Sequence, residues 1–301
     1  MLVTLLGGGG FVGRYVAQEL LARGMRVRIA QRNPGIALRV KPLGGLGQTQ
    51  LMHADVRDAA SIARAVAGAD AVVNLVSVLD GKLDATNHQG AATVAQAAAQ
   101  AGVRALVQIS ALGADSGSPS AYGRSKGQGE DAVRAAFPAA TIIRPSVIFG
   151  PDDQFTNRFA SMARLMPVLP VLAPEAKFQP VYVVDVARAI SDAVEHAAAH
   201  SGQVYELGGP QVLSMMEINR YVAQASGRKD TLLPVCNLGG SILAALPLTP
   251  ITRDQWKMLR SDNVVQQGAK GFAEFGIEPT PLGAVAESWL ISYRKHGRFS
   301  D

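Results

Sequence analysis

The segment Tyr122-Gly-Arg-Ser-Lys126 carries the two side chains best suited to acid–base chemistry in this sequence. Four positions apart on a helix, a tyrosine and a lysine lie on the same face. A cationic lysine beside a phenol favours the phenolate and lowers the pKa of the tyrosine toward a value useful for proton transfer. The same spacing also occurs by chance, so its meaning depends on where the helix lies.

Glycines at positions 7, 10 and 13 separate an apolar run, Leu2 to Leu6, from a helical pattern that runs from Phe11 to Arg23. The first glycine permits a tight turn, the second lets a pyrophosphate approach the backbone, and the third lets the helix pack close to the strand. The helix N-terminus presents free N–H groups and the positive end of its dipole to phosphates. We therefore expect a bound dinucleotide at Gly7, Gly10, Phe11, Val12 and Gly13.

Strand-length apolar runs and helical patterns alternate up to about residue 150. The expected strands are Leu2–Leu6, Arg26–Ala30, Gln50–His53, Ala71–Val76, Ala105–Ile109 and Thr141–Ile143, and the expected helices cover 11–23, 59–66, 84–101 and 121–136. This alternation predicts an α/β protein with a Rossmann-type, doubly wound parallel sheet and helices on both faces.

The pattern becomes mixed after residue 150. We expect a helix near 153–165, a proline-rich stretch over 167–180, strands at Val181–Val184 and Val204–Leu207, and a helix that opens at the capping box Ser214–Glu217. The predicted organisation is a dinucleotide-binding domain over 1–150 and a smaller C-terminal region over 151–301 that is interleaved with it.

Ligands of a doubly wound sheet lie beyond the carboxyl ends of the strands, so residues at these ends are candidates for the cofactor site. No acidic residue follows the second strand, where a site selective for NAD would use one for the ribose hydroxyls. Arg32, with Arg39 or Lys41, is suited to a 2′-phosphate instead, which favours NADP(H) over NAD(H). The alternative is an exposed arginine without a ligand.

Several further positions at this edge are candidates. The Asp55 carboxylate, followed by Val56, is expected near the adenine amino group, with a helix cap as the alternative role. The other expected cofactor contacts are Asn74, Leu75, Val76, Ile109, Tyr122, Lys126 and Pro145.

Composition limits the classes of function. The chain has 301 residues, 48% of them hydrophobic, a net charge of +5 and a single cysteine, Cys236. An internal disulfide is therefore excluded, which fits a reducing compartment. We expect a cytoplasmic protein without a signal peptide or a transmembrane segment, because no apolar run is long enough to span a bilayer.

Charge is concentrated near the N-terminus: residues 1–58 contain eight Arg or Lys and three acidic residues. No basic motif interleaved with aromatic residues appears, so a phosphate-rich small ligand explains this bias better than a nucleic acid. The histidines, at positions 53, 88, 196, 200 and 296, lack the spacing of metal ligands, and we expect no metal site.

The glycine spacing, Asp55-Val56 and Tyr122-x-x-x-Lys126 together resemble the short-chain dehydrogenase/reductase superfamily, of its extended or atypical kind. Longer motifs are similar to one branch, the accessory subunit of respiratory complex I that has this fold, with its bacterial homologues. A coenzyme Q biosynthesis factor is a more distant relative. These motifs are 109–115, 144–151, 178–186, 251–254 and 275–281, so the resemblance runs nearly end to end.

The resemblance implies a tightly held NADP(H) that is structural in the complex I subunit. It also implies that Lys126 hydrogen-bonds the nicotinamide ribose with Tyr122 beside it. One departure concerns Ser110-Ala111, because extended members have Ser-Ser or Ser-Thr here and the second hydroxyl polarises a substrate carbonyl. Ser110 is one residue early, which in a strand turns its side chain to the other face. Unless a bend at the end of the strand redirects the Ser110 side chain, only Tyr122 can polarise the substrate carbonyl.

Two functions remain open from the sequence. One is an NAD(P)-dependent oxidoreductase or epimerase/dehydratase acting on a hydrophobic carbonyl or a sugar-type substrate, which Tyr122 and Lys126 favour. The other is a cofactor-stabilised accessory protein related to complex I and quinone metabolism, which Ala111 and the length of the resemblance favour. Apolar and basic stretches occur in 232–260 and 289–296. Taken singly, each is expected to complete the hydrophobic core of the second region. Together, they form an amphipathic surface near 236–250 that docks on the inner membrane or on a partner.

Overall fold

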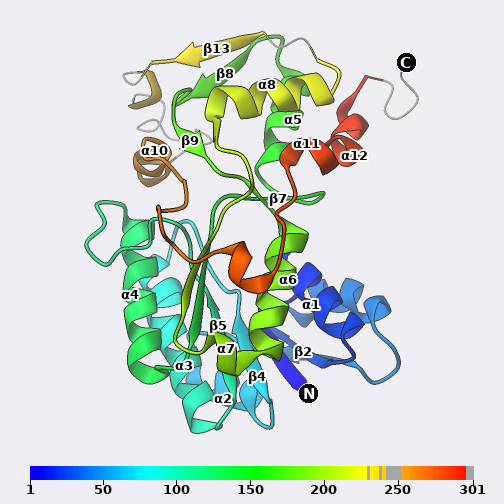
Figure 1. Cartoon of the computed structure of the whole chain (residues 1–301), viewed down its shortest axis with the longest axis vertical. Coiled ribbons are helices and arrows are strands. Elements are labelled where there is room, and N and C mark those ends of the chain that lie inside the picture. Colours follow the sequence, from blue (N-terminus) through cyan, green and yellow to red (C-terminus); the bar gives the residue numbers. More distant parts are fainter. Residues whose placement is uncertain (229–230, 237–238, 242–251, 296–301) are drawn as a thin grey trace. The chain divides into compact units, whose positions relative to one another are not determined.

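The computed structural model describes residues 1–228, 231–236, 239–241 and 252–295, and the chain divides into two compact units (Figure 1). The first unit consists of Met1–Pro145, Val184–Leu207 and Gly268–Ile277. The second consists of Ser146–Val183, Gly208–Gln267 and Glu278–Asp301. The chain therefore leaves the first unit after Pro145 and returns to it twice. The predicted surface at 236–250 falls mostly outside the described residues, as do 296–301.

A parallel sheet of seven strands forms the centre of the first unit, in the order β11-β6-β5-β4-β1-β2-β3 among the described residues. Its strands are β1 (Leu2–Leu6), β2 (Arg26–Gln31), β3 (Thr49–His53), β4 (Ala71–Asn74), β5 (Ala105–Ile109), β6 (Thr141–Pro145) and β11 (Val204–Leu207). β1 lies between β2 and β4, so the strand order reverses at β1. A crevice at such a reversal is where sheets of this type bind ligands.

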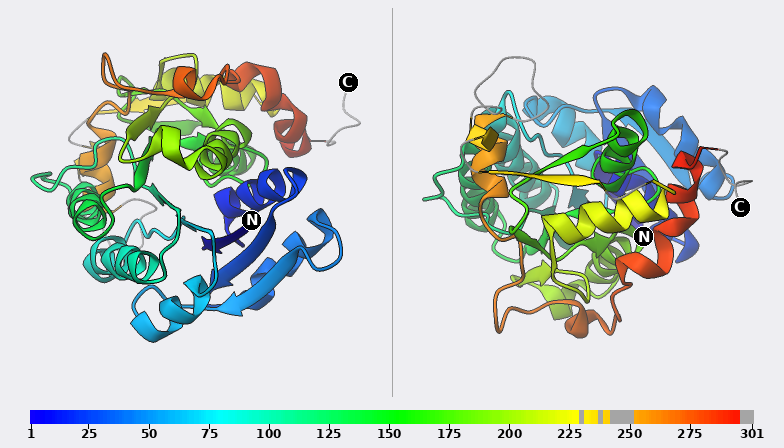
Figure 2. Two further views of the ribbon diagram at one scale, coloured as in Figure 1. Left: turned by 60° about the horizontal axis from the view of Figure 1, so that its bottom comes forward. Right: turned by 90° about the horizontal axis from the view of Figure 1, so that it is seen from above.

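Helices flank both faces of this sheet, as the alternation in the sequence predicts (Figure 2). The helical segments of the first unit are α1 (Phe11–Ala22), η1 (Pro34–Leu43), α2 (Ala59–Val66), η2 (Asp84–His88), α3 (Gln89–Gln100), α4 (Ala121–Ala136), α6 (Val183–Glu195), α7 (Ala197–His200) and η3 (Phe272–Phe275). Buried side chains of α2, α3 and α4 form one core with the sheet. Ion pairs join α1 to α6, from Arg23 to Glu195 at 2.6 Å and from Arg188 to Glu19 at 3.6 Å.

The expected strand Val181–Val184 is wrong in its second half. β10 covers only Val181–Tyr182, pairs with β7 (Ile148–Phe149), and is followed at once by α6. Val183, Val186, Ala187 and Ile190 recur at helical spacing and are fully buried. A short apolar run cannot distinguish a strand from a buried helix, and the period of 3.6 residues becomes visible only over the longer segment.

Small strand pairs and helices form the second unit. β8 (Leu169–Leu172) pairs with β13 (Leu232–Val235) and β9 (Lys177–Phe178) with β12 (Leu213–Ser214). The helical segments are α5 (Thr156–Leu165), α8 (Met215–Ala225), α10 (Arg253–Leu259), α11 (Leu282–Val285), α12 (Glu287–Leu290) and η4 (Ile291–Tyr293). Their core includes Phe149 and Trp289, whose rings stack 6.5 Å apart. The predicted capping box of Ser214 and Glu217 opens α8. In the part of the chain that the structure describes, no helix is long and apolar enough to cross a membrane.

The turn after β1 brings α1 unusually close to the strand. Gly7 has a φ of +80°, which strongly favours glycine. A Cβ added to Gly13 would lie 2.6 Å from the Gly7 carbonyl oxygen and 2.6 Å from the Gly8 Cα. The structural roles that the sequence predicts for the first and third glycines are therefore confirmed.

Gly13→Ala tests this contact. Because the added methyl group meets backbone atoms that cannot move independently, we expect the free energy of unfolding to fall by about 2 kcal/mol, within the range for overpacked cores. Gly117→Ala is the matched control, since its Cβ would meet only the Asp115 carboxylate at 3.5 Å. Equal stability of the two variants in urea titrations would contradict the close approach.

Candidate functional site: a pocket at the carboxyl edge of the sheet

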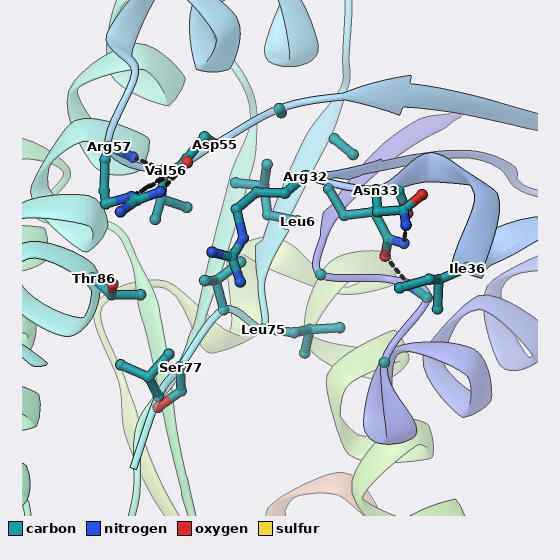
Figure 3. Close-up of a pocket in the computed structure, with 18 residues that line it drawn as sticks. Leu6, Arg32, Asn33, Ile36, Asp55, Val56, Arg57, Leu75, Ser77 and Thr86 are labelled. Atoms are coloured by element: carbon teal, nitrogen blue, oxygen red, sulfur yellow. Dashed lines mark hydrogen bonds and ion pairs between the residues drawn. The ribbon is translucent and has the colours of Figure 1, made fainter. Parts of the chain in front are cut away.

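A pocket of about 530 Å³ lies at the carboxyl ends of β1, β2, β3 and β4, within the first unit (Figure 3). Four segments that follow these strands line it, with Gly7, Gly9 and Gly10 after β1, Arg32 and Asn33 after β2, Asp55 to Arg57 after β3, and Leu75 to Val78 after β4. The pocket thus forms where the strand order reverses, as the general rule for such sheets requires.

The glycine turn is held in shape by side chains of the next two segments. The Gly9 N–H donates to the Gln31 side-chain oxygen at 2.8 Å, and the Arg39 guanidinium donates to the Gly9 carbonyl at 2.9 Å. Gly10 caps α1 without a side chain, so the helix N-terminus stays open to the pocket. Gly7 and Gly10 line the pocket, whereas Phe11, Val12 and Gly13 continue into α1 and are not among its lining residues. Lys41 is not among them either.

Asp55 and Arg57 form an ion pair on the pocket wall (Figure 3). Arg57 donates to both Asp55 oxygens, with its Nε at 3.0 and 3.2 Å and a terminal nitrogen at 2.6 Å. The hydrogen bond from Arg57 lowers the pKa of Asp55 to about 2, and the charge of Arg32 acts in the same direction. Asp55, which was expected to accept a hydrogen bond from the adenine amino group, is therefore bound by Arg57. The guanidinium groups of Arg32 and Arg57 both line the pocket. Nothing in the sequence indicated a ligand role for Arg57.

At the end of β4, some residues line the pocket and one residue supports the lining from behind. Leu75 and Val76 line the pocket, but Asn74 is buried behind it. The Asn74 side chain accepts a hydrogen bond from the Val76 N–H at 3.2 Å and donates to Gln108 at 2.9 Å. Asn74 thus fixes the pocket wall from behind rather than facing it.

Ser77 joins the pocket to Tyr122, because it lines the pocket and its hydroxyl is hydrogen-bonded to the Tyr122 phenol. The Ser77 hydroxyl also lies 3.3 Å from the Asn87 side-chain oxygen. Asn87 in turn bonds the backbone N–H and carbonyl of Val78 and the hydroxyl of Ser125, which is on the same helix as Tyr122. Sequence reasoning missed Ser77 and Asn87, because their roles depend on contacts with α4, which lies far from them in the sequence.

Lys126 is buried, and its ammonium donates to the Ile109 carbonyl at the end of β5 at 2.8 Å. Burial lowers its pKa to about 8, against the opposing effect of Glu130. The expectation that Lys126 lowers the pKa of Tyr122 is wrong for this structure: burial raises the pKa of Tyr122, and the hydrogen bond with Ser77 opposes this rise. Desolvation disfavours the charged form of both groups.

The helix that carries both side chains is fixed by close packing and by charge. A Cβ on Gly127 or Gly129 would collide with the backbone of Asp115–Ser116 or of Asn87. Glu130, almost fully buried, receives two hydrogen bonds from Arg144 of β6 at 2.9 and 2.7 Å.

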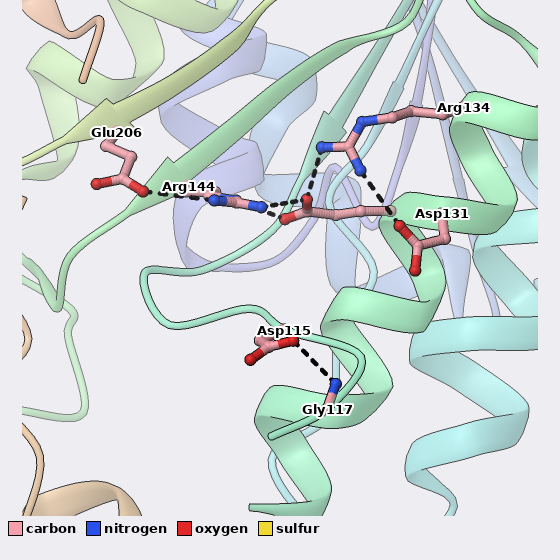
Figure 4. Close-up of polar contacts among 7 residues, drawn as sticks. Asp115, Gly117, Asp131, Arg134, Arg144 and Glu206 are labelled. Carbon is pink, nitrogen blue, oxygen red and sulfur yellow. Dashed lines mark hydrogen bonds and ion pairs between the residues drawn. The ribbon is translucent and has the colours of Figure 1, made fainter. Parts of the chain in front are cut away.

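The same charge network extends to a second strand. Arg144 reaches Glu206 of β11 at 3.4 Å, and Arg134 bonds Glu130 from the other side at 2.9 Å (Figure 4). These carboxylates raise the pKa of Arg144, which stays cationic. The network ties α4 to the sheet and so sets the position of Tyr122 and Lys126.

Ser110 lies directly after β5, and its N–H donates to the Ile143 carbonyl at 2.7 Å. Its hydroxyl is buried and makes no hydrogen bond within the described part of the chain. Ala111, at the position where extended members carry the second hydroxyl, is half-buried. Pro145 ends β6, and its carbonyl accepts from the Leu112 N–H at 3.1 Å. At this edge Tyr122 supplies a phenol, and Ala111 supplies no hydroxyl at the position where extended members carry one.

Among the described residues, no group of three histidines, cysteines or carboxylates is placed to hold a metal ion. His200 is buried, and its two ring nitrogens are hydrogen-bonded to the Tyr205 hydroxyl at 2.8 Å and the Asp192 carboxylate at 2.9 Å. His296 lies outside the described residues.

A family match agrees with this geometry. Residues 3–208 match the family described as NAD dependent epimerase/dehydratase. The chain belongs to that family. It is one of the families with the short-chain dehydrogenase/reductase fold, so the resemblance that the motifs indicate is confirmed.

Individual proteins are similar to this chain over much of its length. The chain is 33% identical to "NADH dehydrogenase [ubiquinone] 1 alpha subcomplex subunit 9, mitochondrial" of Arabidopsis thaliana, over 99% of this chain and 79% of that protein. The mouse protein of the same name is 32% identical over 98% of this chain and 81% of its own length. A ceramide reductase of Caulobacter vibrioides is 33% identical over 62% of this chain and 58% of its own length.

Solved structures share the fold. A nucleoside-diphosphate-sugar epimerase from Staphylococcus aureus superposes with a TM-score of 0.75 at 18% identity, over 96% of this chain and 99% of that chain. UDP-glucose 4-epimerase from Bifidobacterium longum gives a TM-score of 0.73 at 18% identity, over 99% of this chain and all of that one. At these identities the likeness concerns the fold alone.

The buried amine of Lys126 gives a pH test of the site. With a pKa of about 8 in the folded protein and 10.5 unfolded, the folded state binds fewer protons than the unfolded chain between these values. The stability of the wild type relative to Lys126→Met should therefore rise between pH 8 and 10.5, by up to about 3 kcal/mol, and be constant below pH 8. Urea unfolding across this range measures the difference, and exposed Lys82→Met is the control. Parallel profiles for wild type and Lys126→Met would show that the amine is not desolvated.

Proposed function

We propose that this protein binds NADP(H) in preference to NAD(H) and holds it as a lasting part of the structure. The support is the charge of the pocket wall. Arg32 follows β2, where a carboxylate would select NAD, and the one carboxylate among the described residues of the wall, Asp55, is neutralised by its ion pair with Arg57. Guanidinium groups recognise phosphate through charge-assisted hydrogen bonds. The open N-terminus of α1 suits the pyrophosphate.

The function that this site supports best is that of a cofactor-stabilised accessory protein related to respiratory complex I. The observation that carries this proposal is a well-formed dinucleotide pocket beside a substrate edge that has Ala111 in place of the second hydroxyl. The similarity to complex I subunits over nearly the whole chain points the same way. Such a protein would be cytoplasmic and held peripherally at the inner membrane through its partner.

A second candidate function is reduction of a hydrophobic carbonyl compound. Tyr122 and Lys126 retain the spacing that this chemistry uses, and one relative is named a ceramide reductase. Bound NADPH would supply a hydride to the carbonyl carbon. Tyr122 would hold the proton that the carbonyl oxygen takes up, and Ser77 would fix the direction of its hydroxyl. Lys126 would support the cofactor ribose.

The cofactor proposal predicts tighter binding of NADPH than of NADH. Because Arg32 would contribute a charge-assisted hydrogen bond to the 2′-phosphate, Arg32→Ala should reduce the discrimination by about 1–3 kcal/mol. Arg26→Ala, at the opposite end of β2, is the matched control and should change nothing. Isothermal calorimetry measures the affinities for NADPH and NADH in the wild type and in each variant. Equal affinity of the wild type for both dinucleotides would refute the proposal.

Tyr122→Phe separates the two functions. Only a hydroxyl is lost, so folding and NADPH binding should be almost unchanged in either case. If the protein is accessory, its association with complex I in native gels should persist in the variant. If it is a reductase, hydride transfer to an active carbonyl substrate should fall by a factor of about 10² or more, the usual contribution of a positioned acid. A wild-type rate in the variant would remove Tyr122 from the chemistry.

A further inference from the structure

Ser77 is the residue through which the dinucleotide pocket meets Tyr122. It follows the end of β4, lines the pocket and is exposed (Figure 3). Its hydroxyl is also hydrogen-bonded to the phenol of Tyr122, which is half-buried. A serine hydroxyl donates one hydrogen bond and accepts up to two, so the direction of each bond at Ser77 decides what it does for the phenol.

The side-chain amide of Asn87 is fixed in one orientation by the backbone of Val78. The Val78 N–H can only donate, so the oxygen of the amide, Oδ1, faces it at 2.9 Å. The Val78 carbonyl can only accept, so the amide nitrogen, Nδ2, faces it at 2.9 Å. Nδ2 also donates to the Ser125 hydroxyl at 3.1 Å, and Asn87 is almost fully buried. The Asn87 Oδ1 is therefore an acceptor in a fixed place.

This acceptor determines where the Ser77 proton points. The Ser77 Oγ lies 3.3 Å from the Asn87 Oδ1, which has no proton, so Ser77 is the donor of this hydrogen bond. Because the hydroxyl has a single proton, its oxygen is left only as an acceptor toward Tyr122. In the resting site, the proton of the Tyr122 phenol consequently points at Ser77.

The contact between Ser77 and Tyr122 must reverse when the phenol loses its proton. A phenolate can only accept, and hydrogen bonds to an ionised oxygen are stronger than hydrogen bonds to a neutral amide oxygen. The Ser77 hydroxyl would therefore turn from Asn87 to the phenolate. In agreement with this reversal, the hydrogen bond with Ser77 lowers the pKa of Tyr122, against the effect of burial.

The buried charged side chains of α4 are bonded to other groups. Lys126 donates to the Ile109 carbonyl at 2.8 Å, and Glu130 accepts from Arg144 at 2.9 and 2.7 Å. Among the described residues, the two causes that act on the pKa of Tyr122 are burial and the hydrogen bond with Ser77. Ser77 is thus the group that responds to the protonation state of the phenol.

We propose that Ser77 is a positioning residue for the proton of Tyr122, which accepts from the phenol at rest and donates to the phenolate once that proton has left. This inference rests on the reductase function considered above and adds the path of the proton. It gives a use to the exposed position of Ser77, where water in the pocket reaches its hydroxyl.

The proton balance of this path is complete. Bound NADPH supplies the hydride that forms the C–H bond at the carbonyl carbon. The O–H bond of Tyr122 breaks as the carbonyl oxygen takes its proton, and the product is an alcohol. Ser77 then gives its proton to the phenolate, and water in the pocket returns one proton to Ser77. The net reaction consumes NADPH and one proton from solvent and leaves NADP⁺.

The first experiment measures the phenol itself and needs no substrate. Difluorotyrosine at position 122 of the full chain reports its ionisation by fluorine NMR, at a lower pH than tyrosine because fluorine acidifies the phenol. Ser77→Ala should raise the pKa of this phenol by about one pH unit, since the phenolate loses a hydrogen bond. Ser77→Thr keeps a hydroxyl and should restore the wild-type titration. Ser116→Ala removes an exposed hydroxyl and should change nothing.

The second experiment follows the oxidation of NADPH in the presence of a series of long-chain aldehydes and methyl ketones. With a carbonyl that the wild type reduces, Ser77→Ala should lower kcat about tenfold, the counterpart of one pH unit in the pKa of the acid, and leave KM nearly unchanged. Ser77→Thr should keep most of the wild-type rate. Circular dichroism checks that each variant is folded.

Each contrary result has a defined meaning. A fluorotyrosine titration that is the same in Ser77→Ala and in the wild type overturns the inference and leaves the reductase function standing. A rise that Ser77→Thr does not restore assigns the effect to packing and also overturns it. A wild-type rate in Ser77→Ala removes Ser77 from the path of the proton. A wild type that binds NADPH but reduces none of the carbonyls overturns the reductase function together with the part of Ser77 in turnover.

Discussion

The close approach of α1 to the turn after β1 determines where everything else at the carboxyl edge lies. With Gly13 against Gly7 and Gly8, the N-terminus of α1 opens onto the point where the strand order reverses. Gln31 and Arg39 then bond the turn and bring the segment after β2 against it. The pocket is consequently assembled from four strand ends around one fixed turn, and a dinucleotide would contact all four. Its binding free energy would add to the stability of the folded state.

The charged network under α4 fixes the position of Tyr122 and Lys126 whether or not they take part in a reaction. Glu130 and Arg144 are held by hydrogen bonds in a mostly buried setting, where removing one partner would leave an uncompensated charge. The helix would stay in place for this reason even if no substrate were ever turned over. Retention of the Tyr–Lys pair is thus compatible with an accessory protein, and Ala111 gives the clearer indication of how much chemistry the edge supports.

The sequence predicted the sheet well because parallel strands are buried on both faces and appear as continuous apolar runs, as in β1 and β4. It also located the glycine turn and the helix of Tyr122, whose signals are local. It failed at α6, where the apolar run after Val181 was too short to show its period. It did not identify the ion pair between Asp55 and Arg57, which is local, and it could not show that Ser77 and Asn87 meet near Tyr122, because those contacts depend on the tertiary fold. Burial, which raises the pKa of Tyr122, is likewise a property of the folded chain alone.

The segment from Asn33 to Gln48 supports the pocket from the side of β2. Ala37 and Val40 are fully buried, Asn33 and Ile36 line the pocket, and Arg39 donates to the Gly9 carbonyl at 2.9 Å. A dinucleotide that contacts this wall would add its binding free energy to the stability of the folded segment. A dinucleotide that is never turned over would therefore still have a use, since it would hold this part of the first unit in order.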